Sequence, residues 1–249
     1  WIFCNVFGTD GQRFEGVRST KVIQVPGHGG TQFRMGLVGA TINENNPSYV
    51  VFKDPLTSLQ KAVDELKDES DAIVAITHLD FWDDMAIAKS IPELNLIIGG
   101  HDHENMFFRR GENFTPIAKA DANAKTAFVH RLTYDPETEE VKIESTLVQI
   151  NESIKEDPEA KAVIDEWIEK GFQGFRSIGF NPAEVVSTIE FDLDGLEANV
   201  RSKPTKLTRL IADAMVHDAG DVEFALFNGG SIRIDDKLTA GPVTQYDVL

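Results

Sequence analysis

The order of two short apolar runs and the segment between them constrains the fold more than any other feature of this sequence. Residues 72–77 and 94–98 each have the length and composition of a buried β-strand, and residues 83–90 between them are predicted to form a short helix. A strand at 33–42 and a helix that begins at Pro55 are expected before them; this helix carries apolar residues on one face at Leu56, Leu59, Val63 and Leu66. The β-α-β-α-β order favours parallel strands with right-handed crossovers, so the residues that follow these strands share one edge of a sheet.

Three histidines come directly after the two runs. His78 follows the first run, and the second is followed by the sequence GGHDH at 99–103, which contains His101 and His103. Open α/β sheets bind ligands at the carboxyl ends of their strands, and neutral imidazole is a common metal ligand. The two glycines before the pair allow the backbone to turn sharply. The sequence therefore predicts a metal site at this edge; the alternative is a set of surface loop histidines that bind nothing.

The acidic residues near these histidines leave the rest of the ligand set open. A pair of divalent cations needs a bridging carboxylate, so three imidazoles do not complete a two-metal site. Nearby acids could supply it or could be solvated loop residues: Asp80, Asp83, Asp84, Asp102 and Glu104. The other histidines, His28, His130 and His217, are interpreted as structural. Because His with oxygen ligands suits Zn, Mn, Fe or Co alike, the metal is not identified.

A second polar motif, FNGGSIR at 227–233, follows a predicted strand at 223–227. Asn-Gly is a strong hairpin signal, so one interpretation is a tight turn followed by an exposed arginine. The other is a binding loop, in which Asn228 offers an amide and Arg233 a guanidinium fork suited to phosphate or carboxylate. Arg201, just before a predicted helix at 205–217, could join this site. The apolar residues of this helix, Leu207, Leu210, Ile211, Ala214 and Met215, are expected to point inward.

Composition limits the partners and the covalent chemistry of the chain. Its 249 residues carry a formal net charge of −17, which argues against binding a nucleic-acid polymer. Cys4 is the only cysteine, so an intrachain disulfide and a thiolate zinc cluster are excluded. No apolar run approaches the roughly 20 residues that would span a bilayer. Oligomeric state is not addressed by any of these features.

The remaining segments are predicted from periodicity and turn residues. Strands are expected at 2–7, 21–25 and 184–189, and residues 106–150 alternate as in an antiparallel layer with a hairpin turn at Asp135 and Pro136. A long helix is expected to begin at Pro158 and to run into a connector at 171–180, rich in Gly and Phe.

Five motifs in this order resemble the bacterial 5'-nucleotidase family of two-domain metallophosphoesterases. They are THLD at 77–80, GGHDHE at 99–104, LTRLIADAM at 207–215, FNGGSIR at 227–233 and GPVTQYDVL at 241–249. The resemblance implies an α/β fold: residues 1–150 would be the later half of a four-layer α/β/β/α calcineurin-like phosphoesterase sandwich. A linker helix and connector would follow at 151–180. Residues 181–249 would be the first part of an α+β nucleotide-recognition domain.

The resemblance also implies roles for individual residues. His78 and His101 match the family histidines on one metal, and His103 matches a ligand of the other. The residues that match nucleotide contacts are Arg201, Asn228 and Arg233. The implied activity is metal-dependent hydrolysis of nucleotide phosphate esters with two divalent ions, in nucleotide catabolism, by an exported protein. A nucleotide-binding or metal-binding protein without hydrolysis, or a hydrolase of cyclic phosphodiesters or nucleotide sugars, remain the alternatives.

The sequence also departs from the family pattern. The early motifs that carry a bridging Asp and the catalytic His-Asp dyad do not occur, and neither do the aromatic residues that hold the base; both are expected outside residues 1–249. The segment PTKLTR at 204–209 differs from the usual acidic and Asn-Leu-Gly residues. We therefore expect a fragment that holds half of each site and is inactive by itself.

Overall fold

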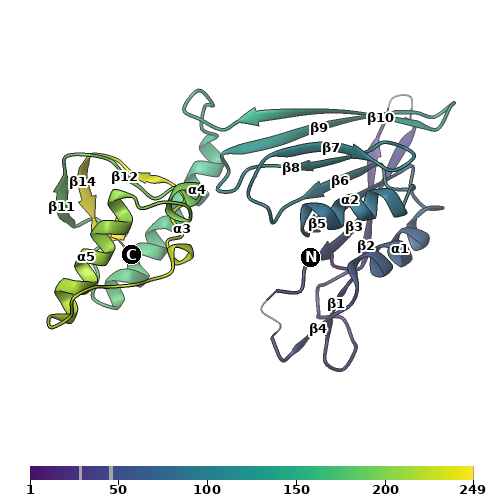
Figure 1. Cartoon of the computed structure of the whole chain (residues 1–249). Helices are drawn as coiled ribbons and strands as arrows, with labels where there is room; N and C mark the ends of the chain where they lie inside the picture. Colours follow the sequence, from purple (N-terminus) through teal and green to yellow (C-terminus); the bar gives the residue numbers. More distant parts are fainter. Residues whose placement is uncertain (28–29, 45–46, 249) are drawn as a thin grey trace. The chain divides into compact units, whose positions relative to one another are not determined.

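The computed structural model describes residues 1–27, 30–44 and 47–248, which form two compact units, Trp1–Lys155 and Glu156–Leu249. Both combine helices and strands, so the predicted α/β class is confirmed (Figure 1). No helix in the described part of the chain is long and apolar enough to cross a membrane.

A six-stranded mixed sheet organises the first unit, with strand order β2-β3-β5-β6-β8-β7. Its strands are β2 (Thr20–Pro26), β3 (Gln32–Thr41), β5 (Ala72–His78), β6 (Leu96–Gly99), β7 (Met106–Arg110) and β8 (Thr115–Lys119). The strands β3, β5, β6 and β8 are parallel to one another, and β2 and β7 pair antiparallel at the two edges. The predicted crossover order of parallel strands is therefore confirmed.

Helices α1 (Pro55–Leu66) and α2 (Phe81–Ser90) cover one face of this sheet (Figure 1). The buried face of α1 carries Leu59, Val63 and Leu66, as the sequence pattern predicts. These residues join a core cluster with apolar side chains of α2 and of the central strands, including Ile87, Ile73 and Ile97. Packing of this kind makes the sheet a rigid support for the residues at its edge.

A long hairpin of β9 (Thr126–Asp135) and β10 (Glu140–Gln149) lies over the other face of the sheet. Phe33 of β3 contacts Tyr134, and Phe107 of β7 contacts Phe128, with ring centroids 5.3 and 5.9 Å apart. The hairpin leaves part of this face open, since Ile76 in β5 is 44% exposed. A small sheet of β1 (Val6–Gly8) and β4 (Val50–Phe52) completes the unit.

Two predictions for the first unit need correction. Residues 106–150 do not form one antiparallel layer: β9 and β10 form a separate antiparallel pair, whereas β7 and β8 pair antiparallel within the six-stranded sheet, where β8 lies parallel to β6. Every residue of β8 is buried, which requires neighbours on both sides and both faces. The strand predicted at 2–7 is confined to its end in β1, and Ile2 makes only an isolated bridge with Arg18.

The second unit consists of short strands and helices around small two-stranded sheets. Its elements are α3 (Pro158–Ser177), β11 (Val185–Ile189), β12 (Leu193–Asp194), α4 (Glu197–Val200), α5 (Lys206–Ala219), a 3-10 turn η2 (Gly229–Ser231), β13 (Lys237–Leu238), β14 (Gly241–Thr244) and α6 (Gln245–Val248). β11 pairs with β14, and β12 pairs with β13. The helices α3 and α5 begin after the polar caps Asp157 and Thr205, close to their predicted starts.

Three predictions for the second unit also need correction. Residues 171–177 of the expected connector belong to α3. Residues 223–227 form no strand, and Phe224 and Leu226 are 76% and 88% exposed, because no described strand pairs with this segment. Of the residues expected to point inward from α5, Leu207 is buried whereas Leu210 and Met215 are exposed. The predicted boundaries at 150 and 181 stay predictions; the change from one compact unit to the other falls between Lys155 and Glu156.

Candidate metal and nucleotide sites

The carboxyl ends of β5 and β6 bring His78 and His101 together. The two strands are parallel, with Thr77 opposite Gly99, and the Gly100 amide donates a hydrogen bond to the Thr77 carbonyl at 2.9 Å. The imidazole centroids of His78 and His101 are 5.2 Å apart, and the rings meet edge to face at 74°. The crossover topology predicts that His78 and His101 lie close together, and the structure confirms this.

Electrostatics at this edge favour a neutral His78. Partial burial lowers the pKa of His78, and the charge of His101 acts in the same direction, with a smaller effect from His103. Only the unprotonated imidazole has a lone pair for a metal. The lowered pKa of His78 therefore favours the form that ligation requires.

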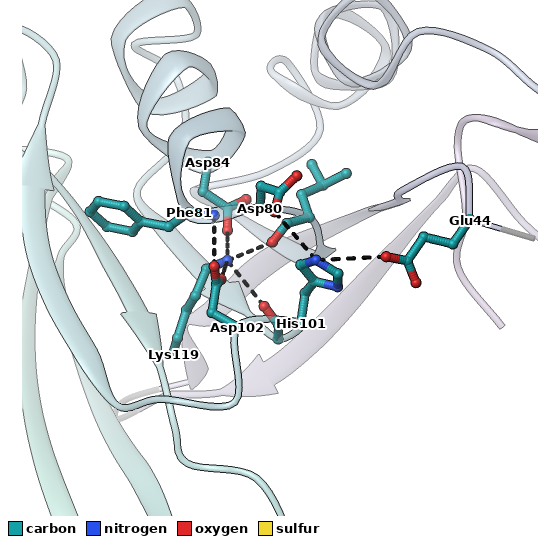
Figure 2. Close-up of polar contacts among 9 residues, drawn as sticks. Glu44, Asp80, Phe81, Asp84, His101, Asp102 and Lys119 are labelled. Carbon is teal, nitrogen blue, oxygen red and sulfur yellow. Dashed lines mark hydrogen bonds and ion pairs between the residues drawn. The ribbon is translucent and has the colours of Figure 1, made fainter. Parts of the chain in front are cut away.

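Two carboxylates lie beside His101, as Figure 2 shows. Its Nε2 atom is 3.3 Å from Asp80 Oδ1 and 3.9 Å from Glu44 Oε1. Asp80 was a candidate from the sequence, but Glu44 was not. Glu44 follows β3, which is parallel to β5 with Thr41 opposite His78, so the same edge rule could have found it.

The other acidic candidates are placed differently. Asp102 pairs with Lys119, and its Oδ1 atom accepts a hydrogen bond from the Phe81 amide at 3.3 Å (Figure 2). Asp84 is fully buried below the loop, and burial raises the pKa of its carboxyl, with Lys119 acting in the opposite direction. The remaining two, Asp83 and Glu104, are exposed. Asp102 and Asp84 therefore support the loop and do not face the histidine pair.

His103 is exposed, two residues beyond His101. Both have positive φ angles, 81° for His101 and 62° for His103, a backbone region that few residues other than glycine adopt. Gly100 is also constrained, since a Cβ atom there would lie 3.2 Å from Nδ1 of His78. Within the described ranges, no group of three or more His, Cys, Asp or Glu side chains is arranged to hold a metal.

The histidines interpreted as structural belong to other segments of the chain. His130 is in β9, where its Nδ1 atom is 2.8 Å from Ser145 Oγ and its ring stacks on Phe128. Burial lowers the pKa of His130. His217 is exposed in the last turn of α5. His28 lies outside the described residues.

The predicted nucleotide contacts line one pocket in the second unit. It has a volume of about 530 Å³ and is lined by Val200, Arg201, Asn228, Gly229, Gly230 and Arg233. The guanidinium of Arg201 pairs with Glu197 at 2.6 Å and is half-exposed, and Arg233 is exposed. Two guanidinium groups and an amide in one pocket suit an anionic ligand.

The loop that carries Asn228 does not form the hairpin turn that Asn-Gly suggested. Asn228 caps the 3-10 turn η2 instead, because its Oδ1 accepts a hydrogen bond from the Gly230 amide at 3.0 Å. A Cβ atom at Gly229 would lie 2.7 Å from the carbonyl oxygen of Val200, so glycine is needed for the close approach of the two segments. The FNGGSIR motif therefore packs closely against the end of α4, beside the pocket.

Solved structures with this architecture define the class of the protein. A 5'-nucleotidase precursor from Thermus thermophilus is 25% identical, with a TM-score of 0.75 over 99% of this chain and 51% of that chain. The structure of the calcineurin-like phosphoesterase YfkN from Bacillus subtilis gives a TM-score of 0.56 at 15% identity, over 68% of this chain and 61% of that chain. The fold is that of 5'-nucleotidases and calcineurin-like phosphoesterases.

Sequence comparisons find similarity to 5'-nucleotidases. Residues 185–249 match the model of the family described as 5'-nucleotidase, C-terminal domain. The trifunctional nucleotide phosphoesterase protein YfkN is 29% identical over 210 residues, 80% of this chain and 14% of that protein. The 5'-nucleotidase of Homo sapiens is 27% identical over 240 residues, 82% of this chain and 40% of that protein. The chain is thus similar to 5'-nucleotidases, with a 5'-nucleotidase C-terminal domain match at 185–249, and it spans less than half the length of these two relatives.

Proposed function

We propose that the full-length protein hydrolyses phosphate esters of nucleotides with the help of two divalent metal ions. The observation that carries this proposal is the convergence of His78 and His101, from two parallel strands, with ring centroids 5.2 Å apart. His103 follows in the same loop. Similarity to 5'-nucleotidases supports hydrolysis of nucleotide phosphoesters in general; the metal and the substrate are the further steps that we propose.

The donor atoms at this edge fit a divalent metal. The pKa of His78 is lowered, which favours its neutral form, and carboxylate oxygens of Asp80 and Glu44 lie near His101. Imidazole with carboxylate suits Zn, Mn, Fe or Co. Such ions, when bound, would neutralise phosphoryl charge and lower the pKa of water to about 7. Because the described residues gather no group of three ligands, we propose that other parts of the full-length protein complete the set.

The residues of the second unit bind and orient the nucleotide in this proposal. Arg201 and Arg233 supply positive charge, and Asn228 supplies an amide at the same pocket. Local cations are necessary because the chain as a whole carries a formal charge of −17. The arginines of the pocket and the bound metal ions would then attract an anionic substrate, whereas the net negative charge of the rest of the chain would repel it.

The decisive experiment measures phosphate release by the full-length protein with Mn²⁺, Zn²⁺ or Co²⁺, over nucleoside monophosphates, cyclic phosphodiesters and nucleotide sugars. We expect monophosphates to be hydrolysed fastest and His78→Ala to lower kcat/KM at least about 100-fold, since even residues behind metal ligands contribute 10–100-fold. His217→Ala, an exposed histidine of the other unit, is the matched control and should have little effect. Equal activity of both variants would exclude the proposed site.

The substrate panel also separates the alternatives. A protein that binds Mn²⁺ and a nucleotide but releases no phosphate would be a binding protein. Preference for a cyclic phosphodiester or a nucleotide sugar would keep the metal site and change the substrate. The relative YfkN is named a trifunctional nucleotide phosphoesterase, which supports testing more than one class of phosphoester.

Residues 1–249 alone are expected to be inactive, since the residues that the structure describes gather too few metal ligands. Turnover by this fragment at the rate of the full-length protein, abolished by His101→Ala, would contradict that expectation. We also propose export of the full-length protein to the periplasm, the cell surface or the medium, which cell fractionation tests directly.

A further inference from the structure

Lys119, the last residue of β8, is buried between the two loops that carry the candidate metal ligands. Its side chain is 1% exposed, and it is among the largest fully buried side chains of the protein. A buried ammonium group is unfavourable unless it is paired and hydrogen-bonded. The contacts that offset this burial therefore indicate what the residue does.

Each hydrogen bond of Lys119 reaches a residue next to a candidate ligand (Figure 2). Its Nζ donates to the carbonyl of Leu79, which follows His78, at 2.6 Å. It donates to the carbonyl of Gly100, which precedes His101, at 3.0 Å. Its third acceptor is the carboxylate of Asp102, which separates His101 from His103. An ammonium group has three N–H donors, and three of the oxygens close to it belong to these loops.

The surroundings of Lys119 fix its position. Asp84 of α2 is fully buried with Oδ2 2.9 Å from Nζ, so the ammonium group is also held from the helix side. A Cβ atom at Gly99 would lie 2.8 Å from both Lys119 Cε and Asp84 Oδ2. The first glycine of the GGHDH motif thus leaves room for the lysine. Asp102 also accepts a hydrogen bond from the Phe81 amide, which connects the same loop to the start of α2.

We propose that Lys119 is a positioning residue that sets the spacing of the two histidine loops for metal binding. It acts through the backbone next to His78 and next to His101. The proposal rests on the metal-dependent function proposed above. Groups behind metal ligands that orient them typically change metal affinity 10–100-fold when they are removed.

The test uses the full-length protein with Lys119→Met/Asp84→Asn, which removes the ammonium group and one buried carboxylate together and so leaves no new net charge. The control is Thr115→Val, on the same strand and also buried, which removes a 2.9 Å hydrogen bond to the Leu94 carbonyl. Leu94 lies outside both histidine loops. Each variant is measured without metal and then titrated with Co²⁺.

Two readouts are expected to change together. Without metal, the amides of Phe81 and Gly100 should exchange their hydrogens at least about 10-fold faster in the double variant, since their loops lose the shared anchor. Co²⁺ should bind about 10–100-fold more weakly. The Thr115→Val control should change neither. Lys119→Gln/Asp84→Asn keeps two N–H donors and should lie between the double variant and the parent, and it replaces the Met variant if that one does not fold.

The outcomes distinguish this proposal from the function on which it rests. Unchanged exchange at Phe81 and Gly100, or unchanged Co²⁺ affinity in a parent that binds Co²⁺, would overturn the positioning role. A parent that binds no Co²⁺ would overturn the proposed metal site, and with it the role of Lys119 in metal binding, even if amide exchange showed that Lys119 anchors the loops.

Discussion

The two compact units differ in how much apolar surface they bury. The core cluster consists entirely of residues of the first unit, from Cys4 to Ile117. In the described part of the second unit, the buried apolar side chains are few, namely Leu193, Val200, Leu207 and Val243. Helix α3 has none, although it carries Ile164 and Trp167 on its surface. The candidate metal site, at the carboxyl ends of β5 and β6, therefore lies on a well-packed sheet. The nucleotide pocket is formed by loops that have few buried apolar side chains around them.

This difference indicates how the two sites achieve their geometry. Local opening has a low free energy where few apolar contacts hold a segment. The positions of His78 and His101 should therefore be stiff, whereas the loop of Asn228 and Arg233 should adjust more easily to a ligand. The following predictions test this contrast, from the largest expected effect to the smallest.

A matched pair of leucine substitutions gives the largest contrast. Leu59 in α1 is fully buried, and Leu207 in α5 is 8% exposed with few buried neighbours. Leu59→Ala should lower the free energy of unfolding by about 3–4 kcal/mol, as is typical for a core leucine. Leu207→Ala should lower it by about 2 kcal/mol or less. Urea denaturation followed by amide exchange in each unit measures both, and equal losses would mean that the second unit has a comparable core.

Ion pairs give the next contrast. In the first unit, Asp71 accepts hydrogen bonds from the Arg34 amide and guanidinium, each at 2.6 Å, and its side chain is 10% exposed. Asp71→Asn should destabilise by about 1.5 kcal/mol, since Arg34 is partly exposed. Asp213, which lies 3.8 Å from Arg209 on α5, is exposed, and Asp213→Asn should change stability by about 0.5 kcal/mol or less.

The Asp71 pair also predicts a pH dependence. The hydrogen bond with Arg34 lowers the pKa of Asp71, so its contribution is fully present above the unfolded value of about 3.9. It is lost as the pH falls from there through the lower folded value. Stability measured from pH 5 downward should therefore decline more in the parent than in Asp71→Asn. Parallel declines would show that the pair does not contribute.

Substitution of a helix cap should lower stability by a similar amount in the two units. Asp54 accepts a hydrogen bond from the Thr57 amide at 2.8 Å in α1, and Thr205 accepts one from the Thr208 amide at 3.2 Å in α5. Asp54→Ala and Thr205→Ala should each lower stability by about 1 kcal/mol, because a cap depends on local hydrogen bonds rather than on the core. Thermal unfolding measures the change. A much smaller loss in α5 would mean that this helix is frayed at its start.

Substitution on α3 should have the smallest effect. Ile164 is 55% exposed, so Ile164→Gln should change the free energy of unfolding by about 0.5 kcal/mol or less. Chemical denaturation of the full-length protein and of its Ile164→Gln variant gives the comparison. A loss of several times this value would show that the apolar face of α3 is covered in solution.

The parallel part of the fold could be predicted because it depends on rules of topology. Once residues 72–77 and 94–98 are strands with a helix between them, parallel pairing places His78 and His101 at one edge. The same rule also places Glu44, which follows β3, at this edge. Glu44 is far from the histidines in sequence, so it is easily overlooked. Proximity to a metal and to a nucleotide stays a prediction until it is measured.

Other features could not be predicted because they depend on contacts distant in sequence. Periodicity does not show that β8 is inserted beside β6, or that residues 223–227 have no strand beside them. Lys119 follows the apolar run Pro116–Ala118 and reads as the polar end of a strand; only the placement of Asp84 and Asp102 shows that it is buried. A lysine directly after a short apolar run was the one signal that the sequence offered.

The left-handed backbone of His101 and His103 has a consequence for selection experiments. A residue other than glycine or asparagine in this region typically lowers stability by about 1–2 kcal/mol. A library selected only for thermal resistance should therefore accumulate Gly or Asn at these two positions, and a library selected for activity should retain His. The residues found at positions 101 and 103 by sequencing would then show whether a library had been selected for stability or for activity.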